Sequence, residues 1–365
     1  MSFDKLVSEQ VFKHKPYQPG KQPKFSTKTI KLNTNENPYP PSPLVKENLF
    51  NQVNQLHLYP ESSSKDLRVC IANLHKVDPD QVIIGNGSDD ILNLCVRSFS
   101  DSSKKVGFFD PSYSLYEVLC SVQGCPTNKI SFQNSSFDID INLITKSGCN
   151  LFFVTSPHAP SGRSYENILF SDILKKYKGI FVIDEAYADF APQNAVNLIK
   201  EFDNLIITRT LSKSYSLAGL RVGYGISSKK IISILNRVRE VYNTDRLAQH
   251  IAKIALTDQE YFSQNTKSII NSRENFYEEL QKWGWHTYKS GANFLFTRPI
   301  GKDGQFGKST AQDLHSFLQN EEVFIRYFPY HPLTEAYVRI SVGKEKEMDM
   351  LLRKLIKWQR KDPQK

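Results

Sequence analysis

Short runs of hydrophobic and β-branched residues alternate with longer segments of helical period through the middle of the chain. The short runs predict strands at residues 81–84, 105–109, 151–155, 179–184, 205–209 and 222–226. The segments between them predict helices, among them residues 89–99, 113–122 and 165–177. Strands separated by helices of this length form right-handed crossovers, so the pattern predicts a doubly wound α/β domain with a mostly parallel sheet.

The two ends of the chain have a different pattern. Residues 1–43 are rich in Pro, Lys, Asn and Gln, which predicts an arm of turns and short extended pieces. Beyond Ser228, helical segments cover residues 231–241, 247–256, 260–283 and 311–319 and a last helix ending near Arg360, and strands are predicted at 293–297, 323–327 and 337–342. We therefore expect an arm at 1–43 that packs with a small α+β domain at 271–365, and a large domain at 44–270. No low-complexity linker separates the domains, which predicts a tight interface.

Charge adds little to this picture. The 365 residues include 47 Lys and Arg against 38 Asp and Glu, a net charge of +9. A nucleic-acid or membrane-surface protein would gather its cations in a stripe or on one helix face. Here the cations are scattered among acids, as in KEKE at residues 344–347. We expect small-molecule ligands, with no nucleic acid and no membrane as partner.

Cysteine usage and hydropathy favour a cytoplasmic protein. The five cysteines form no Cys-x-x-Cys pair and have no histidine at zinc-finger spacing, so we expect free thiols and no metal site. The first residues, MSFDKLVSEQVF, lack the apolar core of a secretory signal. No stretch approaches the ~18 consecutive apolar residues that a membrane span needs.

Polar and ionisable residues follow several predicted strands. GNGSD at 85–89 is a glycine-rich turn that opens a helix, DEAY ends a strand at 184–187, and TLSK follows another at 210–213. In a doubly wound sheet, ligands bind beyond the carboxyl ends of the strands. Each feature alone has an ordinary interpretation as a turn, a cap or a solvated lysine. Together at one sheet edge they are the groups that hold pyridoxal phosphate.

The phosphate of this cofactor needs backbone donors at a helix N-terminus. We expect Gly87, Ser88 and Asp89 to supply them. The hydroxyl of Ser212 and the planar guanidinium of Arg221 are predicted to add side-chain donors.

The ring of the cofactor sets further requirements. Its aldehyde needs a lysine amine for a Schiff base, which predicts Lys213, and its pyridine nitrogen needs a buried carboxylate, which predicts Asp184. Tyr187 is placed to donate to the ring oxygen, and Tyr113 can stack on the ring face. Thr210 completes the predicted cofactor set, and Lys213, Asp184 and Tyr187 are the predicted catalytic residues.

At this point the sequence resembles a known family. The motifs are LNTNENP at 32–38, YP at 59–60 leading to LR at 67–68, GNGSD at 85–89, DEAY at 184–187, TLSK at 210–213, AGLR at 218–221 and VRISVG at 338–343. They resemble the histidinol-phosphate aminotransferases, which are class II aminotransferases with the fold-type I architecture of pyridoxal phosphate enzymes. The resemblance runs in order from about residue 16 to residue 343.

The resemblance also implies roles for residues outside the predicted cofactor-binding set. Tyr59 matches a tyrosine that reaches the cofactor phosphate of the neighbouring subunit, which implies a homodimer with shared sites. Arg339 matches the arginine that binds the carboxylate of the glutamate donor. Tyr17 and Asn35 match residues on the substrate side, and Arg326 is expected to supply a second anion contact.

One position departs from the family pattern. The family usually has an asparagine before Pro-Thr-Gly that donates to the cofactor ring oxygen, and this chain has Ala159 there. Tyr187 would then be the main donor, because we expect the neighbouring His158 to be solvated or bonded to backbone. With fewer donors, the Schiff base is expected to keep its proton to higher pH than in an Ala159→Asn variant.

The implied reaction is a ping-pong amino transfer in which Lys213 moves a proton between substrate and cofactor. Glutamate and imidazole acetol phosphate would give 2-oxoglutarate and L-histidinol phosphate, a step of histidine biosynthesis. An aromatic amino acid aminotransferase and a threonine-phosphate decarboxylase of the same fold remain alternatives, since the cofactor does similar electronic work in each. A pyridoxal phosphate-binding module without catalysis is disfavoured by the presence of both Lys213 and Asp184.

Overall fold

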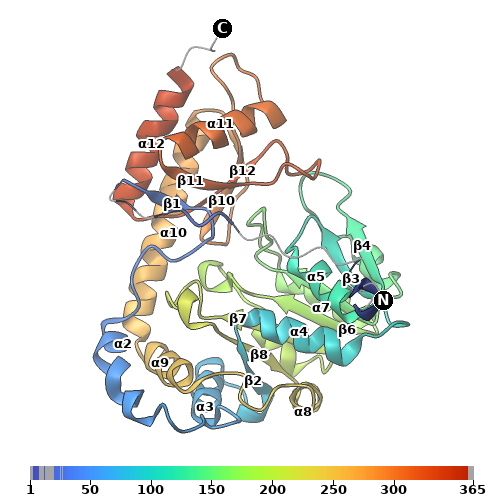
Figure 1. Ribbon diagram of the computed structural model, residues 1–365. Helices are drawn as coiled ribbons and strands as arrows, with labels where there is room; N and C mark the ends of the chain where they lie inside the picture. The colour runs from blue at the N-terminus through green and yellow to red at the C-terminus, as the bar shows by residue number, and fades with distance from the viewer. Residues whose placement is uncertain (1–2, 8–11, 13–19, 25, 27, 361–365) are drawn as a thin grey trace.

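The molecule has two lobes joined by a long helix (Figure 1). The structure is a computed structural model that describes residues 3–7, 12, 20–24, 26 and 28–360. Figure 1 places the seven-stranded sheet in the lower, large lobe and the second sheet in the upper, small lobe.

The large sheet confirms the predicted α/β fold. Its strands are β2 (Val82–Asn86), β3 (Val106–Asp110), β4 (Thr127–Ser131), β5 (Leu151–Thr155), β6 (Ile180–Asp184), β7 (Leu205–Thr210) and β8 (Val222–Ser227). They lie in the order β2-β8-β7-β6-β5-β3-β4, and β8 alone runs against its neighbours. The six predicted strands agree with the observed ones to within two residues at each end. The edge strand β4 was not predicted, because it buries only Ile130 and so lacks a hydrophobic run.

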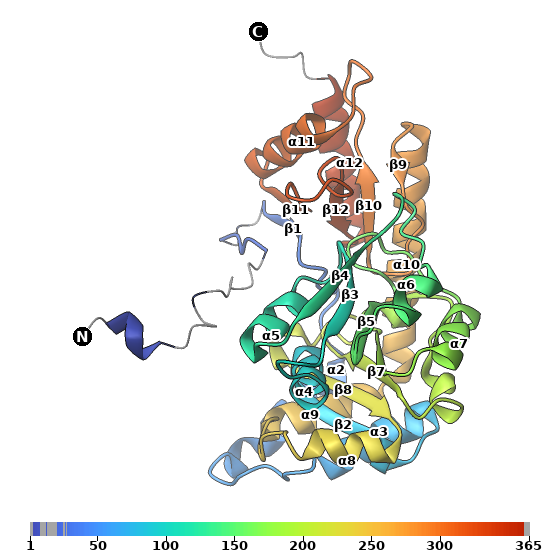
Figure 2. The same ribbon diagram turned by 90° about the vertical axis from the view of Figure 1, so that its right-hand side faces the viewer.

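Helices cover both faces of this sheet (Figure 2). One face packs on α3 (Lys65–His75), α6 (Ile141–Thr145), α7 (Asn167–Lys176) and α9 (Arg246–Thr257). The opposite face packs on α4 (Ser88–Phe99), α5 (Leu115–Gln123) and α8 (Lys229–Asn236). All residues of the central strands β5 and β7 are buried, which explains the hydrophobic runs LFFV in β5 and LII in β7.

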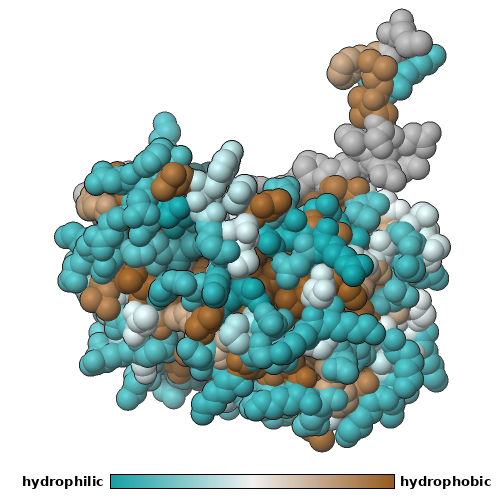
Figure 3. Space-filling model, turned by 90° about the horizontal axis from the view of Figure 1, so that it is seen from below, coloured by the Kyte–Doolittle hydropathy of each residue, from teal (hydrophilic) through white to brown (hydrophobic). Residues whose placement is uncertain are grey.

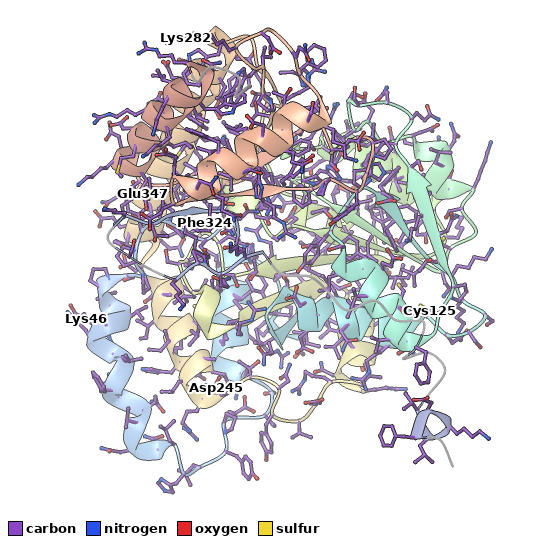
Figure 4. All side chains as sticks on the ribbon, turned by 45° about the horizontal axis from the view of Figure 1, so that its top comes forward. Lys46, Cys125, Asp245, Lys282, Phe324 and Glu347 are labelled. Carbon is purple, nitrogen blue, oxygen red and sulfur yellow. The ribbon has the colours of Figure 1, made fainter. Side chains whose placement is uncertain are left out.

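The small lobe contains five strands in the order β1-β11-β12-β10-β9. They are β1 (Ile30–Leu32), β9 (His286–Thr287), β10 (Phe294–Arg298), β11 (Val323–Tyr327) and β12 (Val338–Ser341). Side chains of α10 (Gln259–Lys282), α11 (Lys308–Asn320) and α12 (Glu345–Arg360) form a hydrophobic core with this sheet. Figure 4 shows Phe324 on β11 and Glu347 and Lys282 in this lobe, with Lys46 and Asp245 in the other.

Two connections relate the lobes. β1, from the segment before the large domain, pairs in parallel with β11 of the small lobe. Helix α10 runs along both lobes (Figure 1), and the predicted domain boundary at residue 270 falls within it. Its start is fixed by Asp258, whose side chain accepts from the Tyr261 N–H at 3.1 Å. The domain limits themselves stay a prediction.

Shorter elements complete the described chain. They are α2 (Pro43–Asn48) and the 3-10 helices η1 (Phe3–Leu6), η2 (Leu49–Gln55), η3 (Pro79–Gln81), η4 (Ala188–Phe190), η5 (Val196–Lys200) and η6 (Ala218–Leu220). All five cysteines are free thiols, as expected. Among the described residues, no helix is both long and apolar enough to cross a membrane.

Candidate active site

A cavity of about 800 Å³ opens between the lobes, at the carboxyl ends of β3, β5, β6 and β7. The structure brings most of the sequence-predicted residues to its wall: Asn35, Ser88, Asp89, Tyr113, Asp184, Tyr187, Thr210, Ser212, Lys213, Arg221, Arg326 and Arg339. Gly87 lies just behind this wall, as the N-cap residue of α4. Tyr17 lies outside the described residues. The predicted sheet edge is therefore part of a single cavity with groups from both lobes.

Lys213 is on the turn after β7 and projects into this cavity. Its amine donates to the Thr34 carbonyl at 3.1 Å, and the Asn37 side chain holds its backbone carbonyl at 2.9 Å. Removal from water, and then the positive charge of Arg339, lower the pKa of Lys213 to about 8. A lysine with such a pKa has a substantial neutral fraction near pH 8 and can act as a nucleophile or a base.

Asp184 ends β6 and is buried beneath the cavity, with 2% of its surface exposed. Its carboxylate accepts from the Tyr116 hydroxyl at 2.8 Å and the Thr208 hydroxyl at 3.1 Å. Burial raises its pKa to about 6. Both of these partners are neutral, so a protonated ring nitrogen would supply the positive charge that this carboxylate lacks. This observation fits pyridoxal phosphate.

Two glycines shape the predicted phosphate-binding region at the start of α4, which we call the anion cup. Gly87 has φ +81°, and a Cβ there would lie 2.5 Å from a guanidinium nitrogen of Arg221. A Cβ on Gly223 of β8 would lie 2.2 Å from the backbone nitrogen of Ser88. Side chains at these positions would push Arg221 and β8 away from the helix N-terminus, where backbone N–H groups bind phosphate.

Hydroxyl and guanidinium groups complete the cup. Arg221 has left-handed backbone geometry, with φ +56°. Its guanidinium lies 3.4 Å from the Ser212 hydroxyl and pairs with the Asp89 carboxylate at 3.1 Å. The Thr210 hydroxyl donates to Ser212 at 2.9 Å. The Tyr113 hydroxyl donates to the other Asp89 oxygen at 3.0 Å, which fixes the tyrosine ring at the cavity wall.

Two arginines of the small lobe face the same cavity. Arg326 of β11 and Arg339 of β12 are directly opposite each other in the antiparallel register. The Phe328 ring centroid lies 5.4 Å from the Arg326 guanidinium and 5.2 Å from that of Arg339, and Phe294 lies 5.1 Å from Arg339. Aromatic faces attract both cations. These contacts position the two guanidinium groups at one cavity, where they can bind an anion with two charges.

Tyr187 lies between the lobes, with its ring packed edge-on against Phe294 at 5.1 Å. Its hydroxyl oxygen accepts from the Asn35 amide at 2.9 Å. Ala159 belongs to the same apolar cluster and brings no donor. His158 is buried and contacts the Pro111 carbonyl at 3.0 Å and the Ser161 hydroxyl at 2.8 Å, so it is bonded to backbone as one of the two expected alternatives.

Sequence reasoning missed the groups beneath the site. Buried Arg209 of β7 forms ion pairs with Glu185, which follows the predicted Asp184, and with Asp189, two residues after Tyr187. Asp189 also accepts from Ser214, the residue after Lys213. Arg209 thus ties the loop after β6 to the loop after β7. The charged Arg209, within a fully buried strand, is the local sign of this network.

Two tyrosines relate differently to the sequence prediction: Tyr116 contacts Asp184 at the site without having been predicted, and Tyr59 was predicted to bind the cofactor of a neighbouring subunit. Tyr116, three residues after Tyr113, was not singled out, although its spacing places it one helical turn further along. Tyr59 lies away from the cavity of its own chain, stacked on Tyr242 with ring centroids 4.5 Å apart, and 77% of its surface is exposed.

Comparison with known proteins agrees with this site. The family model described as aminotransferase class I and II matches residues 27–355. The chain belongs to this aminotransferase family. Pyridoxal phosphate is the cofactor that the family and the site indicate together, and the fold-type I architecture is confirmed.

Individual relatives of this aminotransferase carry a more specific name. The histidinol-phosphate aminotransferase of Rippkaea orientalis is 39% identical over 346 residues, which are 95% of this chain and 96% of the relative. That of Microcystis aeruginosa is 40% identical and covers 92% and 93%.

Solved structures agree with the fold. The histidinol-phosphate aminotransferase from Clostridium acetobutylicum superposes with a TM-score of 0.81 at 26% identity, covering 89% of this chain and 98% of that one. The enzyme from Sinorhizobium meliloti, in complex with pyridoxal-5'-phosphate, gives 0.83 at 24% identity and covers 91% of each chain.

Proposed function

We propose that this aminotransferase interconverts L-histidinol phosphate and imidazole acetol phosphate, with glutamate and 2-oxoglutarate as the second pair, as a step of histidine biosynthesis. The observation that carries the proposal is the pair of arginines, Arg326 and Arg339, that faces Lys213 across the cavity. Two guanidinium groups match both a phosphate dianion and a dicarboxylate. The names of relatives at 39% and 40% identity over nearly the whole chain support the same substrates.

The cofactor-holding residues follow from the geometry. The N-terminus of α4, with Gly87, Ser88 and Asp89, would hold the phosphate together with Arg221 and the hydroxyls that neighbour it. When bound, pyridoxal phosphate supplies an electron sink for the negative charge that develops on the substrate carbon.

The remaining residues would contact the cofactor ring or transfer the substrate proton. Asp184 would hold a proton on the ring nitrogen, Tyr187 would donate to the ring oxygen, and Tyr113 would lie along the ring. The Nζ atom of Lys213 would carry the proton as base and then as acid, which its lowered pKa allows near neutral pH. Thr210 and Ser212 keep this loop in place.

A homodimer is the second part of the proposal. Exposed apolar side chains lie on η2 and on the loops beside it: Leu49, Phe50, Val53, Leu56, Leu58, Tyr59, Val241 and Tyr242. Figure 3 views this end of the molecule and shows apolar residues interspersed among hydrophilic ones. A second copy would cover them and could bring its Tyr59 to this cavity.

Phe3 and Leu6 on η1, which stands apart from both lobes (Figure 2), are also highly exposed.

A half-reaction assay tests the substrate. The cofactor-loaded protein is mixed with histidinol phosphate, phenylalanine or threonine phosphate, and the loss of the cofactor's visible absorbance is followed, with Lys213→Ala as the control. We expect histidinol phosphate to react with the highest kcat/KM. A preference for phenylalanine would identify an aromatic aminotransferase. Release of carbon dioxide from threonine phosphate would identify a decarboxylase. If no donor reacts, the protein is a binding module without catalysis.

Two further measurements test the remaining parts. Sedimentation velocity of the loaded protein should give the mass of a dimer, and a monomer would contradict the shared site. Fractionation of the producing cells should place the protein in the cytoplasm. The role expected of Tyr17 stays a prediction from sequence.

A further inference from the structure

Asn35 has every polar group of its side chain engaged, although it was expected to face the substrate. It is almost fully buried, with 1% of its surface exposed, and has left-handed backbone geometry with φ +56°. Its backbone N–H donates to the Ser341 hydroxyl at 2.9 Å, and that hydroxyl donates to the side-chain oxygen of Asn35 at 2.9 Å. The Asn293 amide donates to the Asn35 carbonyl at 2.9 Å. The small lobe therefore fixes both the backbone and the side chain of Asn35.

These contacts also determine which way the amide of Asn35 faces. The proton of the buried Ser341 hydroxyl needs an acceptor, and the Asn35 side-chain oxygen provides it. The amide nitrogen is then left facing Tyr187, to which it donates at 2.9 Å. If the amide were turned over, two donors would point at Ser341 and its own proton would lose this acceptor.

The direction of the amide fixes the direction of the tyrosine proton. A phenol hydroxyl has one proton, and the Tyr187 oxygen already accepts from Asn35. The proton must point to another acceptor, and Tyr187 lines the cavity that would hold the cofactor ring. Ala159, in the same cluster, has no side-chain donor for that ring. The charged groups that face Tyr187 are Arg339, Asp184, Asp89 and Lys213.

We propose that Asn35 is a positioning residue that directs the Tyr187 hydroxyl proton toward the ring oxygen of the cofactor, and that Ser341 and Asn293 of the small lobe hold it in that orientation. Asn35 acts through Tyr187, so its contribution depends on the tyrosine hydroxyl. Through these contacts the small lobe controls a donor that belongs to the large lobe. The inference rests on the proposed cofactor and is independent of which amino donor reacts.

The test is an absorbance titration of the bound cofactor in the substrate-free holoenzyme. A donor to the ring oxygen withdraws electron density from the conjugated system, so weakening that donor makes the chromophore keep its proton to higher pH. We expect Tyr187→Phe to raise the titration midpoint by about one pH unit and Asn35→Ala to raise it by about half a unit, the size of one hydrogen bond. Ser341→Ala should give a smaller rise in the same direction.

A double substitution separates positioning from a general disturbance of the site. If Asn35 acts through Tyr187, adding Asn35→Ala to Tyr187→Phe should leave the midpoint of the single Tyr187→Phe variant unchanged. Asn204→Ala is the control, because the Asn204 amide also makes two hydrogen bonds, donated to the Tyr177 and Gly179 carbonyls, but lies outside the cavity. Its midpoint should equal that of the wild type.

Two results would overturn the proposal. One is an unchanged midpoint in both Asn35→Ala and Ser341→Ala. The other is an Asn35→Ala shift that persists at full size in the Tyr187→Phe background. Ser341→Ala removes only one oxygen and keeps the test open if Asn35→Ala does not fold. A protein that binds the cofactor but fails to react with histidinol phosphate would contradict the proposed substrate and leave this titration readable.

Discussion

Replacing Asp184 with asparagine should stabilise the cofactor-free protein while weakening its hold on the cofactor. In the folded chain, burial raises the pKa of Asp184 to about 6, from an ordinary value of 3.8. The folded state therefore binds this proton more tightly than the unfolded state does. Below about pH 4 the carboxyl is neutral in both states, and between pH 4 and 6 stability falls as pH rises, because the buried group must ionise.

The size of the effect follows from that difference. About two pKa units correspond to about 3 kcal/mol of unfolding free energy above pH 6, as an upper limit. For a chain of this length, 3 kcal/mol is a rise of about 4 °C in the midpoint of thermal unfolding. Asparagine keeps the shape of aspartate and can accept from Tyr116 and donate to Thr208, so the polar contacts at the end of β6 are conserved.

The assay is thermal unfolding of cofactor-free wild type and Asp184→Asn at pH 8 and at pH 4.5. We expect the variant to be more stable at pH 8 and the difference to shrink at pH 4.5. Asp172→Asn, on the exposed face of α7 near Lys175, is the control and should change stability by less than about 0.5 kcal/mol. A variant less stable than the wild type at pH 8, or a gain of equal size at both pH values, would refute the reasoning.

Four other outcomes are expected. Gly87→Ala should weaken cofactor binding about tenfold or more, because the added Cβ would clash with the Arg221 guanidinium and because residue 87 has a positive φ. Gly219→Ala is the control and should not weaken binding, because the space around Gly219 is open. A fluorescence titration measures cofactor binding by both variants. The rate at which the cofactor-free protein captures pyridoxal phosphate should rise through about pH 8 as Lys213 loses its proton, and a rate that is flat from pH 7 to 9 would contradict this. Arg209→Met should lower the unfolding free energy by about 3 kcal/mol in a melting experiment, because it removes the cation that pairs with the buried Glu185 and the partly buried Asp189. Arg326→Lys should raise the KM for a phosphorylated substrate about tenfold with little change in kcat, since lysine cannot form a bidentate contact.

The predicted elements agree best with the structure where one physical signal dominates locally. The strands β5 and β7 are buried along their whole length and begin with runs of three or four hydrophobic residues, and their predicted positions match to within one residue. The edge strand β4, with one buried side chain, gave no such signal. The predicted helix at residues 231–241 ends early, as α8 at Asn236, and the Arg239 guanidinium donates to the Glu240 and Val241 carbonyls in the following loop.

The sequence by itself determined the fold class, the sheet edge that carries the chemistry and the identities of Lys213, Asp184 and Arg221 at that edge. These follow from local patterns, namely hydrophobic period, turn chemistry and the rule that ligands bind beyond the carboxyl ends of parallel strands. Motif order then indicated the family.

Only the tertiary structure decided how these groups are joined. Asn35 contacts Tyr187 across 152 positions of sequence and Ser341 across 306, and Arg326 faces Arg339 because β11 and β12 share one antiparallel register. No local period encodes such contacts, since they depend on how the two lobes pack. The donor to Tyr187 and the pairing of the two arginines are therefore properties of the folded chain.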